Sequence, residues 1–71
     1  MADTTALRNL IAKRGLKMKF LAESLGLSQY GFQLKVDNKN DFKVSEVKVL
    51  RELLQIESLE EMERIFFRDS E

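Results

Sequence analysis

The chain has 71 residues, of which 44% are hydrophobic and 34% are charged, and its twelve basic and twelve acidic residues give a net charge of zero. This length suits a single domain spanning residues 1–71, and the composition is that of a folded chain. The chain lacks cysteine and histidine, which excludes disulfides and removes the usual ligands of zinc and haem and the usual base of acid–base catalysis. We therefore expect no metal, no cofactor and no enzymatic activity.

The sequence also shows no sign of a membrane span or an export signal. It has no run of about 18 apolar residues, and its N-terminal residues lack the basic and apolar regions of a signal peptide. The chain contains no proline, which suits a protein built mainly of helices. These features predict a soluble, cytoplasmic, all-α protein that does not enter a membrane.

The charged residues are unevenly distributed along the chain. Residues 1–43 contain eight basic and four acidic residues, a balance of +4, whereas residues 44–71 contain four basic and eight acidic residues, a balance of −4. From Arg8 to Lys19 there are five basic residues and no acidic residue. Such asymmetry indicates a polyanion as the partner of one end of the molecule, although ordinary solvated surfaces also produce runs of like charge.

In chain order, the first predicted helix begins at Asp3 or Thr4, both favourable N-caps, and ends at Gly15. Its apolar stripe consists of Leu7, Leu10 and Ile11. A second helix is predicted over about residues 17–25, and Gly26 stops it because glycine accepts the left-handed backbone conformation.

The third predicted helix runs from Gln29 to about Val36, with Ser28 as its N-cap. The next seven residues, 37–43, are polar and rich in turn formers. Ser45 is the expected N-cap of a fourth helix, and the apolar stripe of that helix consists of Val47, Leu50, Leu53 and Leu54.

The last predicted helix spans residues 58–67. Ser58 followed three residues later by Glu61 has the spacing of a capping box. The short connections between the five predicted helices favour a compact five-helix bundle.

Residues 17–36 fulfil four requirements of a helix-turn-helix. Ala22 is small enough for the second helix to cross the first, and Gly26 permits the sharp turn that follows. Leu27 supplies an apolar residue to fill the turn, and Phe32 supplies the inward residue of the second helix. An ordinary pair of antiparallel helices packed for stability could show the same spacing.

The stretch from Leu16 to Lys39, LKMKFLAESLGLSQYGFQLKVDNK, resembles the helix-turn-helix of the phage Cro/repressor family, also called the XRE class. The resemblance extends over about residues 7–56, because a short helix ending in Lys-Arg-Gly precedes the motif and a helix ending in Leu-Leu-Gln-Ile follows it. Leu27 to Lys39 and the Ile-Phe-Phe ending are most similar to small Cro-like regulators and modulators of repression, or antirepressors, of temperate phages of Gram-positive bacteria. The resemblance implies a lambda-repressor-like DNA-binding domain.

Two positions depart from the family pattern. Lys17 stands where the family usually has Thr or Ser before the first motif helix, which weakens the cap and adds a positive charge. Asn38 stands where the loop after the second motif helix usually has glycine. Asparagine tolerates the left-handed conformation, so the turn is still expected there.

The resemblance implies that the helix beginning at Gln29 enters the major groove of operator DNA. The candidate base-reading residues are Gln29, Tyr30 and Gln33, because glutamine can pair with adenine through two hydrogen bonds and tyrosine can contact a thymine methyl group or a phosphate. The candidate phosphate contacts are Lys17, Lys19, Ser28, Lys35, Asn38 and Lys39. Plainer interpretations stand beside these: Gln29 and Gln33 as solvated helix surface, Tyr30 as a half-buried aromatic packed over the adjacent helix, and Lys35 and Lys39 as charges that keep the protein soluble. Lys35 also lies where the family often buries an apolar residue.

The C-terminal helix offers a candidate partner interface at Glu60, Glu61, Phe66 and Phe67. Two adjacent phenylalanines cannot both face inward from one helix, so Phe67 is expected either to contact a partner, such as a second copy of the chain, or to wrap back onto the bundle. The acidic residues that accompany this helix are Glu57, Glu60, Glu61, Glu63, Asp69 and Glu71.

The sequence therefore favours a Cro-like transcriptional regulator that occupies operator DNA in a phage or mobile-element switch, with a homodimer as one expected assembly. The alternative is an antirepressor that uses its acidic end to bind and sequester the basic DNA-reading face of a partner phage repressor. An antitoxin of similar fold is a third hypothesis.

Overall fold

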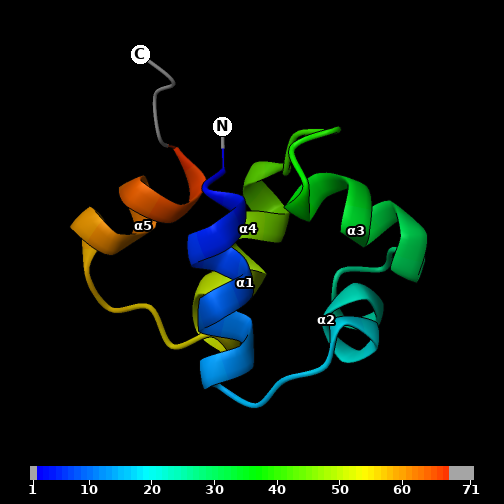
Figure 1. Cartoon of the computed structure of the whole chain (residues 1–71), viewed down its shortest axis with the longest axis horizontal. Coiled ribbons are helices and arrows are strands. Elements are labelled where there is room, and N and C mark those ends of the chain that lie inside the picture. The colour runs from blue at the N-terminus through cyan, green and yellow to red at the C-terminus, as the bar shows by residue number, and fades with distance from the viewer. Residues whose placement is uncertain (1, 68–71) are drawn as a thin grey trace.

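Capped ends and short apolar stripes divide the chain into five helices. The computed structural model describes residues 2–67. Within that range the helices are α1 (Thr4–Lys13), α2 (Met18–Ser24), α3 (Gln29–Val36), α4 (Val44–Leu53) and α5 (Leu59–Phe66), and no strand occurs. Figure 1 shows α1 in the middle of the molecule, with α2 and α3 on one side of it and α5 on the other. The expected all-α, five-helix class is confirmed.

Three of the expected helix starts are confirmed by a capping hydrogen bond. The side chain of Asp3 accepts from the backbone N–H of Ala6 at 3.0 Å. The Ser28 hydroxyl accepts from the N–H of Gly31 at 3.0 Å, and the Ser58 hydroxyl accepts from the N–H of Glu61 at 3.2 Å. Each bond satisfies one of the N–H groups that have no partner within their own helix.

The expected start of the fourth helix at Ser45 is wrong. The helix begins at Val44, with Lys43 as its N-cap. The cause is Glu46, whose carboxylate reaches back and accepts a hydrogen bond from the backbone N–H of Lys43 at 2.8 Å. A glutamate at this third helical position satisfies the N-cap residue itself, so the chain turns into the helix before Ser45.

The core lies where the five helices and their connections meet. Leu7 of α1 and Leu21 of α2 are completely buried, and Ile65 of α5 is 2% exposed. The other completely buried side chains are Phe32, Val36, Leu50 and Leu54. In a chain without disulfides, burial of this apolar surface is the main source of stability.

A line of aromatic rings crosses this core from α3 to α5. The Phe42 ring lies 6.2 Å from that of Phe32 and 5.7 Å from that of Phe66, both centroid to centroid and both in edge-to-face geometry. Such pairs add to the stabilisation that apolar burial provides. The connection between α3 and α4 therefore packs into the bundle at Phe42.

Phe66 and Phe67 have opposite environments, as the sequence predicted for adjacent phenylalanines. Phe66 is 4% exposed, whereas Phe67 is 55% exposed. We predict that Phe66→Ala lowers the free energy of unfolding by about 3–5 kcal/mol, because it removes a buried ring. Phe67→Ala should change it by about 0.5 kcal/mol, as for other surface substitutions. Urea denaturation followed by circular dichroism measures both, and equal losses would contradict the assignment of Phe66 alone to the core.

Candidate nucleic-acid interface

The connection between α2 and α3 is a tight turn held by its own backbone. Gly26 has a φ of +72°, and the N–H of Leu27 donates to the Ala22 carbonyl at 2.9 Å. Ala22 is 1% exposed where the helices pack, and Leu27 is partly buried against the core. With Phe32 completely buried, all four residues occupy the environments that the sequence predicts for them.

α3 divides into an inward and an outward side. Phe32 and Val36 face the core with no exposed surface. The three candidate base-reading residues, Gln29, Tyr30 and Gln33, are all exposed, and Tyr30 has 71% of its surface accessible. The structure therefore places the side chains that the sequence singled out on the solvent side of one helix.

The first turn of α3 is shaped around its cap. Ser28 is exposed, and its hydroxyl oxygen is engaged by the N–H of Gly31. A Cβ atom added at Gly31 would lie 3.1 Å from that oxygen. The glycine thus leaves room for the cap, while the remaining lone pair of the hydroxyl and its proton stay accessible at the surface.

Three of the candidate phosphate-contacting lysines project freely. Lys17, Lys19 and Lys39 are exposed. Lys17 is the N-cap of α2 and makes no side-chain capping bond there, in line with the weak cap that the sequence predicts. Lys17 precedes α2, Lys19 lies in its first turn, and Lys39 follows α3.

Lys35 differs from the other candidate phosphate contacts because its charge is paired inside the protein. Its Nζ lies 2.6 Å from Oε1 of Glu46, and the two side chains are 11% and 8% exposed. Burial raises the pKa of the Glu46 carboxyl, but the hydrogen bonds from Lys35 and from the Lys43 backbone, together with both positive charges, outweigh burial and bring that pKa below its ordinary value. A phosphate would therefore have to compete with Glu46 for the Lys35 ammonium group.

The amide of Asn38 is also committed inside the protein. Asn38 has a φ of +62°, as expected for a residue standing in place of glycine. Its Oδ1 accepts from the N–H of Ala2 at 2.9 Å, and its Nδ2 donates to the carbonyl of Ala2 and, at 3.3 Å, to the hydroxyl of Thr4. The side chain thus ties the N-terminal segment to the end of α3, and a phosphate contact would compete with these bonds.

The candidate partner residues of α5 lie on the other side of α1. Phe66 belongs to the core, which removes it from the exposed interface expected there, and Phe67 remains exposed. Glu60 is exposed, and the Glu61 carboxylate lies 3.7 Å from the Arg64 guanidinium. Asp69 and Glu71 of the acidic end fall outside residues 2–67.

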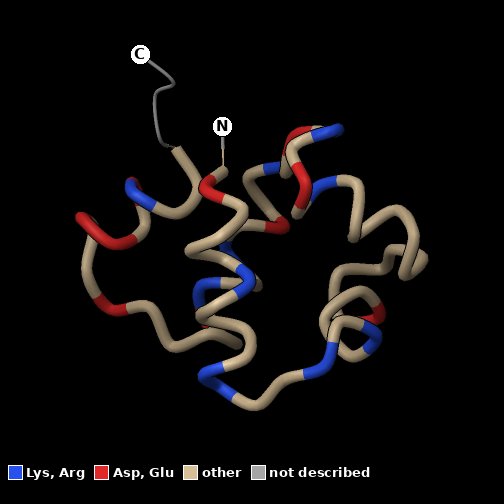
Figure 2. The backbone as a smooth tube through the Cα atoms, in the orientation of Figure 1, with Lys and Arg blue, Asp and Glu red and all other residues tan. Residues whose placement is uncertain are grey.

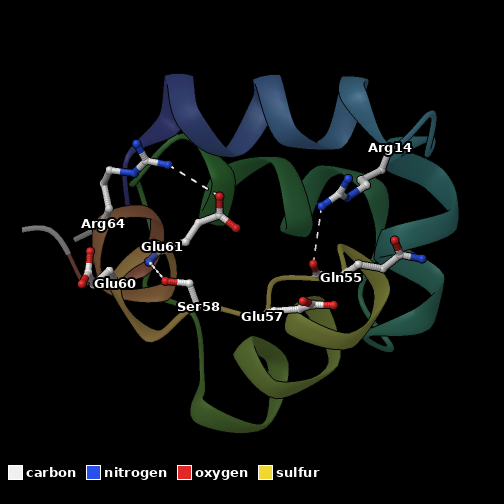
Figure 3. Close-up of a pocket in the computed structure, with 7 residues that line it drawn as sticks. All are labelled: Arg14, Gln55, Glu57, Ser58, Glu60, Glu61 and Arg64. Carbon is white, nitrogen blue, oxygen red and sulfur yellow. Dashed lines mark hydrogen bonds and ion pairs between the residues drawn. The ribbon is translucent and has the colours of Figure 1, made fainter.

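An open depression of about 650 Å³ adjoins the start of α5 (Figure 3). Glu57, Glu60 and Glu61 line it, together with Arg14 and Arg64. Arg14 is occupied in holding the end of α4, because its Nε donates to the Leu54 carbonyl at 2.7 Å and its Nη2 to the Gln55 carbonyl at 3.4 Å. The accessible charge around the depression is therefore mainly negative.

Part of the charge asymmetry of the sequence persists in space, although Arg14, which follows α1, borders the acidic depression. Figure 2 shows acidic segments along the α4–α5 connection and the start of α5, and basic segments at the end of α1 and the start of α2. Long-range fields depend on such placement rather than on net charge. An anionic partner is favoured near the basic segments, and a cationic one near the acidic segments.

Glu46 belongs to this region although the sequence did not indicate it. Its only signal was a position three residues after the N-cap, which would have required the helix start to be placed at Lys43. The contact of Arg14 with the carbonyls that follow α4 was likewise not predicted, because it joins residues 40 positions apart. Neither pairing is visible in helical periodicity.

Comparison of the chain with protein-family models, with curated proteins and with solved structures found no match. Among residues 2–67, no helix combines the length and apolar character needed to cross a membrane.

We predict that the contribution of Glu46 to stability is lost in acid. Its pKa in the folded protein lies below the ordinary value of 4.5, so the unfolded chain binds the proton more readily and the free energy of unfolding falls as the pH falls. The stability advantage of the parent over Glu46→Gln should be fully present above pH 4.5 and shrink as the pH drops through the lower folded pKa. Urea denaturation across this range measures the advantage.

Glu52→Gln provides a control of equal charge change on an exposed part of α4. If the advantage over Glu46→Gln stayed constant well below pH 4.5, the carboxylate would not be held in its charged form by Lys35 and Lys43.

Proposed function

We propose that this protein is a Cro-like transcriptional regulator that binds operator DNA through a helix-turn-helix formed by α2 and α3, in the genetic switch of a phage or mobile element. The observation that carries the proposal is the division of α3, which buries Phe32 and Val36 and exposes Gln29, Tyr30 and Gln33. The resemblance of residues 16–39 to the Cro/repressor family supports the same assignment.

In the proposed mechanism, α3 lies in the major groove and α2 crosses the DNA backbone. Gln29 and Gln33, one helical turn apart, read adenine through paired hydrogen bonds, and Tyr30 contacts a neighbouring base or phosphate. Lys17, Lys19 and Lys39 contact phosphates and set the register without reading the sequence. Occupation of the operator then blocks RNA polymerase.

A single module of this size is expected to bury only about 600–1,000 Å² of protein surface on DNA. We therefore propose that two copies bind together, with half-sites one turn of the double helix apart. Phe67, 55% exposed at the end of α5, is the proposed contact between copies, because an exposed aromatic ring gains most from burial against a partner.

The acidic residues around the depression near α5 favour a second candidate function. In this alternative the protein acts as an antirepressor, and Glu57, Glu60 and Glu61 dock on the basic DNA-reading face of a partner repressor. Complementary fields would speed that encounter. Failure of the folded protein to select any duplex would favour this second function over the first.

Substitution of the reading helix tests base recognition. Gln33→Ala should leave the fold intact, because the side chain is exposed. It should cost about 1–3 kcal/mol of discrimination between the duplex that the protein enriches from random sequences and a shuffled duplex. Fluorescence anisotropy with both duplexes measures the effect, and unchanged discrimination would contradict the assignment of α3 as the reading helix.

Substitution of a proposed phosphate contact should behave differently. Lys19→Ala should weaken binding to the enriched and shuffled duplexes alike and reduce the slope of log K against log salt by about 0.9, the value for one phosphate contact. Anisotropy titrations at several salt concentrations measure the slope. Lys48→Ala, an exposed lysine of α4, is the control, and an equal effect of both substitutions would show a general charge effect instead of a contact at Lys19.

A further inference from the structure

Lys35 holds an unusual position for a lysine near a nucleic-acid-binding surface. Only 11% of its side chain is exposed, and its ammonium group lies 2.6 Å from Glu46 Oε1. Lysine is rarely buried to this degree unless its charge is paired. The pair joins the last turn of α3 to the first turn of α4 across the connection that separates them.

Glu46 is itself held in place, which makes it a fixed anchor. The same Oε1 atom that contacts Lys35 accepts the backbone N–H of Lys43 at 2.8 Å. Among the described residues, Glu46 is the one charged residue that is buried, with 6% of its surface exposed. The start of α4 therefore orients the carboxylate. The carboxylate in turn holds the Lys35 ammonium group, so the last turn of α3 is tied to α4.

Because of where Lys35 lies on α3, the ion pair influences the direction in which the exposed side chains of that helix point. Successive residues of a helix are about 100° apart, so Lys35, two residues after Gln33, projects to nearly the opposite side of the helix. Burial of Phe32 and Val36 sets which side of α3 faces the core, but the hydrophobic effect that drives this burial is not itself directional. The Lys35 side chain is 11% exposed and has little room to follow a movement of the helix. Because a hydrogen bond weakens steeply when its angle is distorted, a rotation of α3 that moved Gln33 would also weaken the contact with Glu46.

We infer that the Lys35–Glu46 ion pair is a positioning device for base reading, which fixes the rotation of α3 about its own axis, and that Lys35 contacts no phosphate. This inference rests on the proposed function for its consequence in DNA recognition. It assigns Lys35 and Glu46 as positioning residues and leaves Lys17, Lys19 and Lys39 as the phosphate contacts.

The experiment uses the double variant Lys35→Met/Glu46→Gln. Removal of one partner alone would leave the other charge unpaired and would lower stability for a reason unrelated to the direction of α3. The double variant removes both charges, and the amide oxygen introduced by Glu46→Gln can still accept the Lys43 N–H. The matched control is Lys48→Met/Glu52→Gln, which makes the same two changes at exposed positions of α4.

Binding to the enriched and shuffled duplexes is measured at several salt concentrations for the parent and both double variants. We expect the ratio of the two affinities to fall about tenfold or more in Lys35→Met/Glu46→Gln, on the scale of one lost base contact. The affinity for the shuffled duplex and its salt slope should stay at the parent values. An unchanged ratio would overturn the positioning role, and a loss on both duplexes with a slope lower by about 0.9 would make Lys35 a phosphate contact.

Amide hydrogen exchange without DNA separates this inference from the proposed function. The amides of α3 should exchange faster in Lys35→Met/Glu46→Gln than in the parent or the control, because α3 has lost its link to α4. Unchanged exchange in α3 would overturn the inference whether or not the protein binds DNA. Faster exchange in α3 of a protein that selects no duplex would support the link and reject only the proposed function.

Discussion

Burial of Phe32 and Val36 determines which side of α3 faces solvent, and the rest of the arrangement depends on that choice. Both side chains are completely buried, so the helix presents Gln29, Tyr30 and Gln33 outward. The turn at Gly26 brings α2 against the same helix, and the Phe42 ring extends the packing of Phe32 towards α5. In a chain of 71 residues without cysteine, such packing has no covalent substitute.

Much of the fold could be predicted from local signals in the sequence. Asp3, Ser28 and Ser58 are caps that act within three residues, and Gly26 marks a backbone conformation that few other residues accept. The misplaced start of α4 shows the limit, because Ser45 is a favourable cap by type, whereas Glu46 determines the start by reaching back to Lys43. Gln55 likewise adopts a φ of +55° at a position that carries no glycine or asparagine signal.

The candidate site was harder to predict where side chains engage partners far along the chain. Lys35 and Asn38 were candidate phosphate contacts because they lie at the end of the expected reading helix and just after it, where a lysine or an asparagine can reach a phosphate. In the structure Lys35 pairs with Glu46, and Asn38 binds Ala2 across 36 positions. Because these two side chains bind partners within the protein, fewer phosphate contacts are proposed than the sequence suggested. Each phosphate contact adds to the affinity for DNA of any sequence. With fewer such contacts, base contacts from the exposed side of α3 supply a larger share of the proposed affinity for the operator.

Selection of random duplexes by the purified protein, with the size of the complex measured in parallel, tests the central claim most directly. Operator binding through α3 predicts enrichment of a palindrome whose half-sites are about 10 base pairs apart, held by a complex of two chains. A folded protein that enriches no sequence at near-physiological salt would contradict the claim that α3 reads DNA.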